Sequence, residues 1–239
     1  MEAEAAQRYA RTGGWLYALL FVAGSSLFIQ SGSIISGNAA ATAHNIEASS
    51  QLWRIALAAE IVMYALDVPL AVIFYVLMRP VNNGLALASS AFRFAEAVLG
   101  CTIALLNAVP LYVLNGSAYL KAIGRPQLDA LAYVSLKAHG DGAVIALLLF
   151  GIHCVLLGYL VFRSGYLPKA LGLLLIIAGL CYATHCTAQF VAPAFDDRIY
   201  PWILLPGFPA EVGFCLWLIF AGVNRSRWNE RTRLQSAAT

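Results

Sequence analysis

Six long apolar stretches constrain this chain more than any other feature, because each of them can cross the hydrocarbon core of a lipid bilayer. A helix needs about 20 residues to cross a core of about 30 Å. Backbone groups in lipid must find their partners within the segment, and these stretches are continuous rather than alternating, so we expect helices and not a barrel. The predicted fold is all-α, a polytopic six-transmembrane-helix bundle, with spans near residues 15–35, 55–78, 85–114, 131–162, 168–191 and 201–223.

The composition agrees with a membrane location. Hydrophobic residues make up 61% of the chain and charged residues 11%, whereas a soluble domain carries about 25% charged residues. A single soluble core of this size could not bury so much apolar surface. These values exclude an ordinary soluble enzyme, a nucleic-acid-binding protein and a disordered chain. We expect the lipid bilayer as the main partner and the inner (plasma) membrane of a cell as the location.

The distribution of Lys and Arg predicts the orientation of the spans. With both termini cytoplasmic, ten cations fall on the cytoplasmic side and four on the outer side. We therefore expect one transmembrane domain over residues 1–239, with a short cytoplasmic N-terminus at 1–13 and a basic cytoplasmic tail at 224–239. The ten cytoplasmic cations are Arg8, Arg11, Arg79, Arg93, Arg163, Lys169, Arg225, Arg227, Arg231 and Arg233.

Three features outside the apolar stretches carry further predictions. Asn38 is expected to cap a short helix after the first span. Trp228, within the basic tail, is expected to rest on the anionic inner leaflet. The first span is expected to be retained, because the acidic start with Glu2 and Glu4 is untypical of a signal peptide; the small residues at 39–41 leave cleavage open as an alternative.

Ionisable residues inside the spans are the candidate functional residues, because burying them in lipid is costly. Arg93 and Glu96 are three residues apart on one helix, so we expect them to neutralise each other. The fourth and fifth spans are joined by a short turn, and we expect His139 and His185 to face each other across this antiparallel pair. Helix rise places Glu60, His139, Asp141, His185 and Gln189 at an outer level, and Asp67, Glu96, His153 and Glu211 at a middle level.

Two kinds of cofactor could use the histidines. Imidazoles from two helices are the usual axial ligands of a membrane b-type haem, which His139 and His185 could supply. A zinc-like metal is the alternative, with His139, His185 and Cys181 as candidate ligands, because Cys181 and His185 lie four residues apart on one helical face. The spacing allows both cofactors and selects neither.

Proton chemistry is the third use of these side chains. Desolvation favours the neutral form of a carboxyl group, which can then donate a proton. The break at residues 206–209 beside Glu211 favours a cavity, because irregular backbone in a membrane is tolerated where protein or water covers it. The candidate catalytic acids are Glu60, Asp67 and Glu211.

These residues predict a buried site more strongly than simple interhelical hydrogen bonding, which is the structural alternative. We expect a small multi-pass membrane protein that binds a lipophilic ligand or cofactor in a pocket in its outer half. The alternatives are an intramembrane enzyme with acid/base or metal-assisted chemistry, a proton-coupled transporter, a haem-binding redox protein, and an accessory subunit of a membrane complex; a homo-oligomer is also open. The expected ligand-binding residues are Glu60, Glu96, His139, Asp141, His153 and His185.

Several segments, spread over nearly the whole chain, carry a resemblance to known proteins: 38–43 with 45–46, 66–68, 77–82, 91–93, 150–160, 163–168, 171–172, 210–211 and 216–218. They resemble an uncharacterised bacterial family of membrane proteins, domain-of-unknown-function family 4386. The resemblance implies a multi-pass inner-membrane protein and carries no activity, cofactor or site residue. Pro69 and the segment 206–209 differ from the family pattern.

Overall fold

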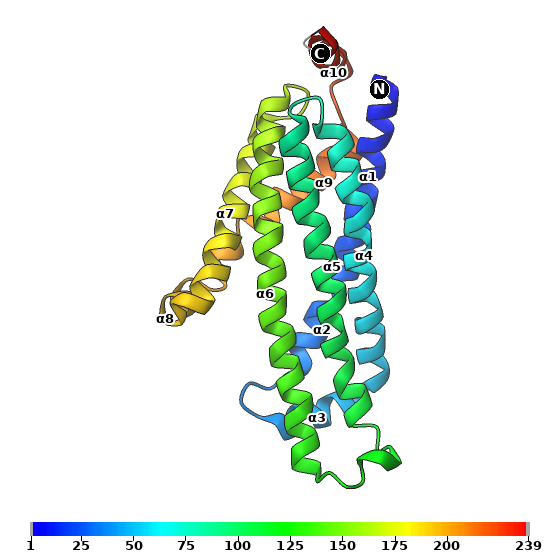
Figure 1. The fold of residues 1–239 in the computed structure, drawn as a ribbon, viewed down its shortest axis with the longest axis vertical. Helices are drawn as coiled ribbons and strands as arrows, with labels where there is room; N and C mark the ends of the chain where they lie inside the picture. Colours follow the sequence, from blue (N-terminus) through cyan, green and yellow to red (C-terminus); the bar gives the residue numbers. More distant parts are fainter. Residues whose placement is uncertain (1, 238–239) are drawn as a thin grey trace. The chain divides into compact units, whose positions relative to one another are not determined.

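The computed structural model describes residues 2–237, and all regular secondary structure in that range is helical. Long apolar segments without turn residues favour this outcome, since each helix satisfies its own backbone in lipid. The elements are α1 (Ala3–Gly24), α2 (Ser26–Ser33), α3 (Ala39–Ala48), α4 (Ser50–Met78), α5 (Asn83–Val113), η1 (Ala118–Leu120), α6 (Arg125–Ser164), α7 (Lys169–Val191), α8 (Pro193–Ile199), η2 (Trp202–Leu204), α9 (Gly207–Phe220) and α10 (Arg225–Ala237) (Figure 1).

The prediction of six spans is confirmed. Six helical segments of the described chain are long and apolar enough to cross a membrane. The fourth is longer than predicted, at 40 residues, because its helix continues past the apolar stretch at both ends. The six segments are Ala3–Ser33, Ser50–Met78, Asn83–Val113, Arg125–Ser164, Lys169–Val191 and Trp202–Phe220.

The first span is interrupted at Ser25, between α1 and α2. The Ser25 hydroxyl donates a hydrogen bond to the backbone carbonyl of Val22 at 2.7 Å, one turn back. After this span Asn38 caps α3, as predicted: its side-chain oxygen accepts a hydrogen bond from the backbone N–H of Ala41 at 2.9 Å. A cap of this kind satisfies one of the N–H groups that a helix leaves free at its start.

The chain forms two compact units, and the boundary between them passes through four helices. Unit 1 comprises residues 1–19, 66–97 and 145–239, and unit 2 comprises residues 20–65 and 98–144. Thus α1, α4, α5 and α6 each contribute one stretch to each unit, while α7, α9 and α10 belong wholly to unit 1 and α3 to unit 2. The prediction of a single domain stays a prediction.

In unit 1, α6 and α7 are antiparallel neighbours in direct backbone contact (Figure 1). A Cβ atom added to Gly158 would lie 2.6 Å from the carbonyl oxygen of Gly172, and one added to Gly151 would lie 3.0 Å from that of Gly179. Both pairs are seven residues apart along their helices, so they recur on one face. Small residues usually allow close helix packing in lipid, where burial of apolar surface does not drive helix association.

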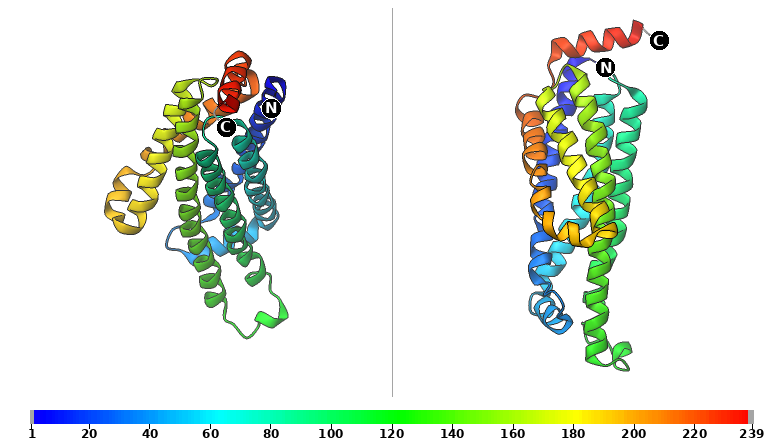
Figure 2. Two further views of the ribbon diagram at one scale, coloured as in Figure 1. Left: turned by 45° about the horizontal axis from the view of Figure 1, so that its top comes forward. Right: turned by 90° about the vertical axis from the view of Figure 1, so that its left-hand side faces the viewer.

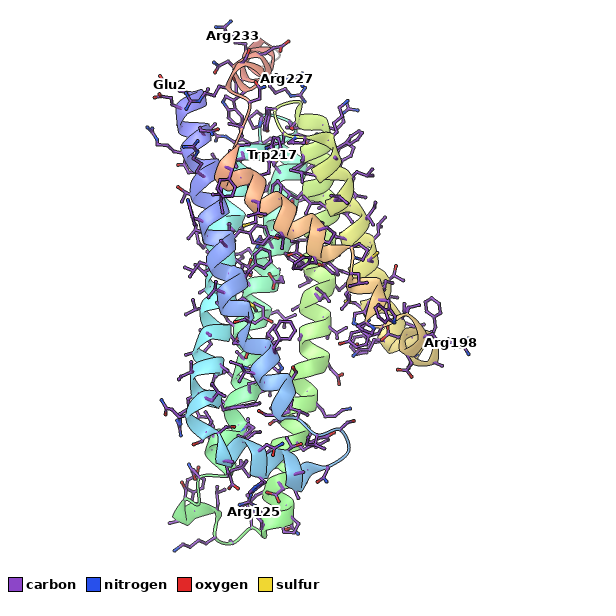
Figure 3. The ribbon with its side chains drawn as sticks, turned by 180° about the vertical axis from the view of Figure 1, so that it is seen from behind. Glu2, Arg125, Arg198, Trp217, Arg227 and Arg233 are labelled. Carbon is purple, nitrogen blue, oxygen red and sulfur yellow. The ribbon has the colours of Figure 1, made fainter. Side chains whose placement is uncertain are left out.

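The proline- and glycine-containing segment 206–209 is the start of α9. Gly207 lies against the hydroxyl of Tyr182 on α7, and a Cβ at this position would overlap that side chain. Near the other end of α9, the Cys215 thiol donates to the carbonyl oxygen of Gly14 on α1 at 3.4 Å. Figure 3 shows the resulting oblique course of α9, from α7 to α1, with Trp217 near its α1 end.

The tail forms α10, which packs on the protein at the end of unit 1 where α1 begins (Figure 2). Trp228 is fully buried, with its ring centroid 4.9 Å from that of Tyr166. Burial raises the pKa of Tyr166, which keeps its hydroxyl protonated as a donor to the carbonyl of Leu77. The prediction that Trp228 rests on the membrane surface is therefore wrong, because Tyr166 gives the indole a protein contact.

Candidate functional site

A buried ion pair lies in unit 1. Arg93 on α5 is 1% exposed, and its guanidinium forms a salt bridge with the carboxylate of Asp67 on α4. This partner differs from the prediction, in which Arg93 and Glu96 neutralise each other on one helix. Residues three apart on a helix can be neighbours, but α4 is near enough to present a carboxylate directly to the guanidinium.

The same guanidinium has two further kinds of contact, with an imidazole nitrogen and with aromatic rings. Arg93 Nη1 lies 3.2 Å from Nε2 of His153 on α6. Its Cζ atom lies 5.2 Å from the ring centroid of Tyr17, 5.4 Å from that of Phe74 and 5.2 Å from that of Phe150. Aromatic faces attract a cation that has lost its water. Arg93 is thus held by groups from three other helices, α1, α4 and α6, so it does not belong among the cations that predict orientation. The remaining nine against four keep the same preference.

The tautomer of His153 follows from its neighbours. Its Nδ1 lies 2.9 Å from the backbone carbonyl oxygen of Ser89, which can only accept, so Nδ1 carries a proton. Nε2 is then the acceptor for Arg93. His153 is fully buried, and Phe74 stacks on it with a centroid distance of 6.1 Å. The ring is therefore neutral and fixed in orientation.

Glu96, one turn after Arg93 on α5, is buried without a complete set of partners. Its Oε2 has no hydrogen-bond partner among residues 2–233, and the same holds for Arg93 Nε. The carboxyl group nonetheless lies within electrostatic range of Asp67, Arg93 and Glu211. An unsatisfied buried oxygen beside other carboxyl groups is costly, so this position differs from an ordinary interhelical contact.

Glu211 on α9 is held by two tyrosines. Tyr17 on α1 donates to Glu211 Oε2 at 2.9 Å, and Tyr182 on α7 donates to Oε1. The contact between Gly207 and Tyr182 fixes the start of α9, four residues before Glu211. We call the set Asp67, Arg93, Glu96, His153 and Glu211, with Tyr17 and Tyr182, the Arg93 cluster. It holds three carboxyl groups and one guanidinium.

A second polar network lies in unit 2 around Glu60 on α4, which is fully buried. Three donors from three other helices reach its carboxylate. Gln30 Nε2 donates to Oε2 at 2.9 Å, Asn107 Nδ2 donates to Oε2 at 2.9 Å, and His139 Nε2 donates to Oε1 at 2.6 Å. We call Gln30, Glu60, Asn107 and His139 the Glu60 network.

The donor roles in this network follow from counting hydrogens. Asn107 Nδ2 has two hydrogens, which reach Glu60 and the Gln30 side-chain oxygen, each at 2.9 Å. It has none left for His139 Nε2, although that nitrogen lies 3.1 Å away. His139 Nε2 therefore carries its own proton and donates it to Glu60. The protein itself fills the hydrogen-bonding positions around Glu60.

His185, at the end of α7 in unit 1, has a separate carboxylate partner. Its Nδ1 lies 2.7 Å from Oδ1 of Asp196 on α8, and its ring stacks on Tyr200 with a centroid distance of 5.2 Å. His139 and His185 thus belong to different units and each contacts a different acid. The prediction that they face each other stays a prediction.

The structure brings together the four residues predicted at the middle level, Asp67, Glu96, His153 and Glu211, in the Arg93 cluster. Of the outer level it joins Glu60 to His139. Asp141 is exposed, Gln189 is half-buried, and His185 pairs with Asp196. Among residues 2–233 no group of three or more His, Cys, Asp and Glu side chains is arranged to hold a metal, Cys181 included. The metal prediction therefore gains no ligand set, and the haem prediction stays a prediction.

Five side chains that complete these sites were not predicted from the sequence. They are aromatic, hydroxyl or amide residues within apolar segments, or an acid outside them, and a single such residue is ordinary in a membrane helix. Gln30 had the clearest signal, because an amide within an apolar stretch needs a partner. The five are Tyr17, Gln30, Ser89, Tyr182 and Asp196.

The helices and their buried ionisable groups define a multi-pass helical membrane protein. Residues 12–222 match the family model described as "Domain of unknown function (DUF4386)", so the chain belongs to that family, and the predicted resemblance is confirmed. An uncharacterized protein of Archaeoglobus fulgidus is 32% identical over 157 residues, which cover 66% of this chain and 77% of that protein. No solved structure matches the chain.

Proposed function

We propose that this is a proton-coupled membrane protein, in which Glu96 and Glu211 bind and release protons around the fixed pair of Arg93 and Asp67. The observation that carries the proposal is the charge count of the Arg93 cluster, with one guanidinium for three carboxyl groups. Only one carboxylate can be neutralised by Arg93. Since unpaired charges are strongly disfavoured in a low-dielectric interior, the other two carboxyl groups need protons.

The two carboxyl groups are suited to different parts of this role. Glu211 has two tyrosine donors, which can stabilise its anion when the proton leaves. Glu96 has a free oxygen, which is available to a water molecule or to the polar group of a ligand. A ligand that binds at Glu96 would exchange with its proton. Proton-coupled transport of a small molecule is the activity that uses both properties, as buried acids do in secondary transporters.

The Glu60 network supports ligand binding less well. All three of its contacts to Glu60 come from the protein, so a ligand would have to displace Gln30, Asn107 or His139. An intramembrane enzyme would use the same acids as the transporter, and its substrate would also need access to Glu96. The charge count does not distinguish an enzyme from a transporter, because both would use the same proton.

The test is to follow protonated carboxyl groups in the full-length protein reconstituted in liposomes. Infrared difference spectra recorded across a pH titration detect the C=O stretch of a protonated carboxyl. We expect a band that is lost in part in Glu96→Gln and in part in Glu211→Gln. The control is Glu230→Gln on the exposed face of α10, which should leave the band unchanged. Spectra of both buried-acid variants that equal the wild-type spectrum would contradict the proposal.

A further inference from the structure

A cavity in unit 2 is lined by residues that do not belong to the Glu60 network. Its volume is about 230 Å³, and it is lined by the end of α3, the first turns of α4 and the last turns of α5. Two membrane-spanning segments end here, at Ser50 and Val113. Since spans end near the lipid head groups, we expect the cavity at the depth where the head groups meet the hydrocarbon core.

The wall of the cavity is divided by polarity. Ile46, Pro110, Leu111 and Leu114 form an apolar part. The polar part consists of Glu47, Ser50, Arg54 and Asn115. A wall with apolar and charged parts at this depth suits an amphiphile, with its chain against the leucines and its head group against the polar side chains.

The charges of the lining residues determine which head group fits. Glu47 is already neutralised, because Arg125 donates to its two oxygens at 2.8 and 2.6 Å. Arg125 also pairs with Asp129 at 2.6 Å. The Arg54 side chain forms no ion pair or hydrogen bond with any residue in the range 2–233. The cavity thus presents one cation that the protein leaves uncompensated.

We propose that this cavity binds the phosphate group of an amphiphile. Arg54 pairs with the phosphate, for which the planar guanidinium is well shaped, and Ser50 and Asn115 donate hydrogen bonds to it. One water molecule takes about 30 Å³, so a volume of about 230 Å³ accepts a head group and the first methylene groups only. The rest of the chain continues along Leu111 and Leu114 into the lipid. This site is independent of the proposed proton function.

The test is a calorimetric titration of the full-length protein in a phosphate-free maltoside detergent. Dihexanoyl phosphatidic acid is one probe and inorganic phosphate is the other, and the two distinguish a lipid phosphate from a free phosphate. We expect dihexanoyl phosphatidic acid to bind. Arg54→Gln should lower its affinity about tenfold or more, because a charge-assisted hydrogen bond contributes more than a neutral one. Arg54→Lys should lower the affinity less. Equal affinity for the two probes would show that the apolar wall contributes nothing to binding, and would overturn the proposal that the ligand is an amphiphile.

Two further variants keep the result interpretable. Leu111→Trp should weaken binding of the lipid phosphate, because the larger side chain fills the cavity. Lys121→Gln removes an exposed cation of the same unit that does not line the cavity, and it should leave binding unchanged. Arg54 is exposed, so Arg54→Gln should unfold at the wild-type temperature. Absence of binding, or an equal loss in Arg54→Gln and Lys121→Gln, would overturn the proposal.

Discussion

At the scale of single residues, Arg93 shows how a charge persists inside an apolar helix. Its guanidinium meets one carboxylate, one imidazole nitrogen and three aromatic faces, all within unit 1. Each contact replaces part of the water that the group gives up on burial. The Asp67 carboxylate supplies the countercharge, so these two residues depend on each other more than on any neighbour along the chain.

Asp67→Asn should therefore destabilise the protein strongly. Removing one partner of a buried ion pair leaves an uncompensated charge and costs about 3–5 kcal/mol. Thermal unfolding in detergent, followed by circular dichroism, is the measurement. The double variant Asp67→Asn/Arg93→Met should recover part of the loss, and Asp141→Asn, at an exposed position, should have little effect. A single variant as stable as the wild type would show that Arg93 does not rely on Asp67.

Substitutions of Glu60 and Ser26, both in unit 2, should have opposite effects on stability. Glu60→Gln places an amide among three donors, so at least one buried donor loses its acceptor, which costs about 1–3 kcal/mol. The buried Ser26 hydroxyl has no hydrogen-bond partner among residues 2–233, so Ser26→Ala should keep or raise stability. The same thermal measurement compares the two variants. Equal losses of stability in the two variants would indicate that the number of hydrogen-bond partners does not control stability at these positions.

At the scale of elements, close approach of backbones organises the helices of unit 1. Glycines on α6 and α7 meet in two successive layers, and Gly207 allows α9 to begin against Tyr182. In water, burial of large apolar side chains would drive such contacts, but lipid removes that advantage. Small residues instead allow dispersion contacts and backbone proximity over a long interface. The position of Glu211 depends on this packing through Tyr182.

Gly172→Ala should separate α6 from α7. Its methyl group would lie 2.6 Å from the Gly158 carbonyl oxygen and 2.6 Å from the Phe162 backbone nitrogen, neither of which can move away cheaply. Overpacking of this kind costs about 1–3 kcal/mol. Gly140→Ala is the matched control on α6, because its methyl group would meet nothing within 4 Å. A thermal unfolding temperature that falls in Gly140→Ala but not in Gly172→Ala would contradict the packing account.

At the scale of the whole molecule, the number of spans and the charges of the connecting segments control topology. Six spans place both termini on one side of the membrane. Lys and Arg near the ends of spans are retained preferentially in the cytoplasm. The basic α10 lies at the end of unit 1 where α1 begins (Figure 2). Its buried Trp228 packs against Tyr166.

Both termini should therefore be cytoplasmic. A fluorescent protein fused after Thr239 should fluoresce in cells, because it folds in the cytoplasm, whereas alkaline phosphatase fused at the same place should be inactive. A phosphatase inserted after Gly116, in the segment between α5 and α6, should be active. The reverse pattern of activities would show that the cation distribution does not determine the orientation of this chain.

Part of the candidate site could be predicted from the sequence. Asp67, Glu96, His153 and Glu211 share a level because helix rise converts residue number into depth, and the structure places them in one unit. Their partners could not be predicted in this way. Arg93 pairs with Asp67 rather than Glu96, because the choice depends on how α4 and α5 are rotated about their axes, which residue number does not specify.

The sequence by itself determined the class of protein, the number of spans and the helix cap at Asn38. Each of these depends on a local property, such as the length of an apolar stretch or a side chain next to its own helix. Only the tertiary structure decided the contacts of Arg93, the closeness of α6 and α7, and the burial of Trp228. Those features join segments that are far apart in the sequence, so they depend on packing, which no local pattern encodes.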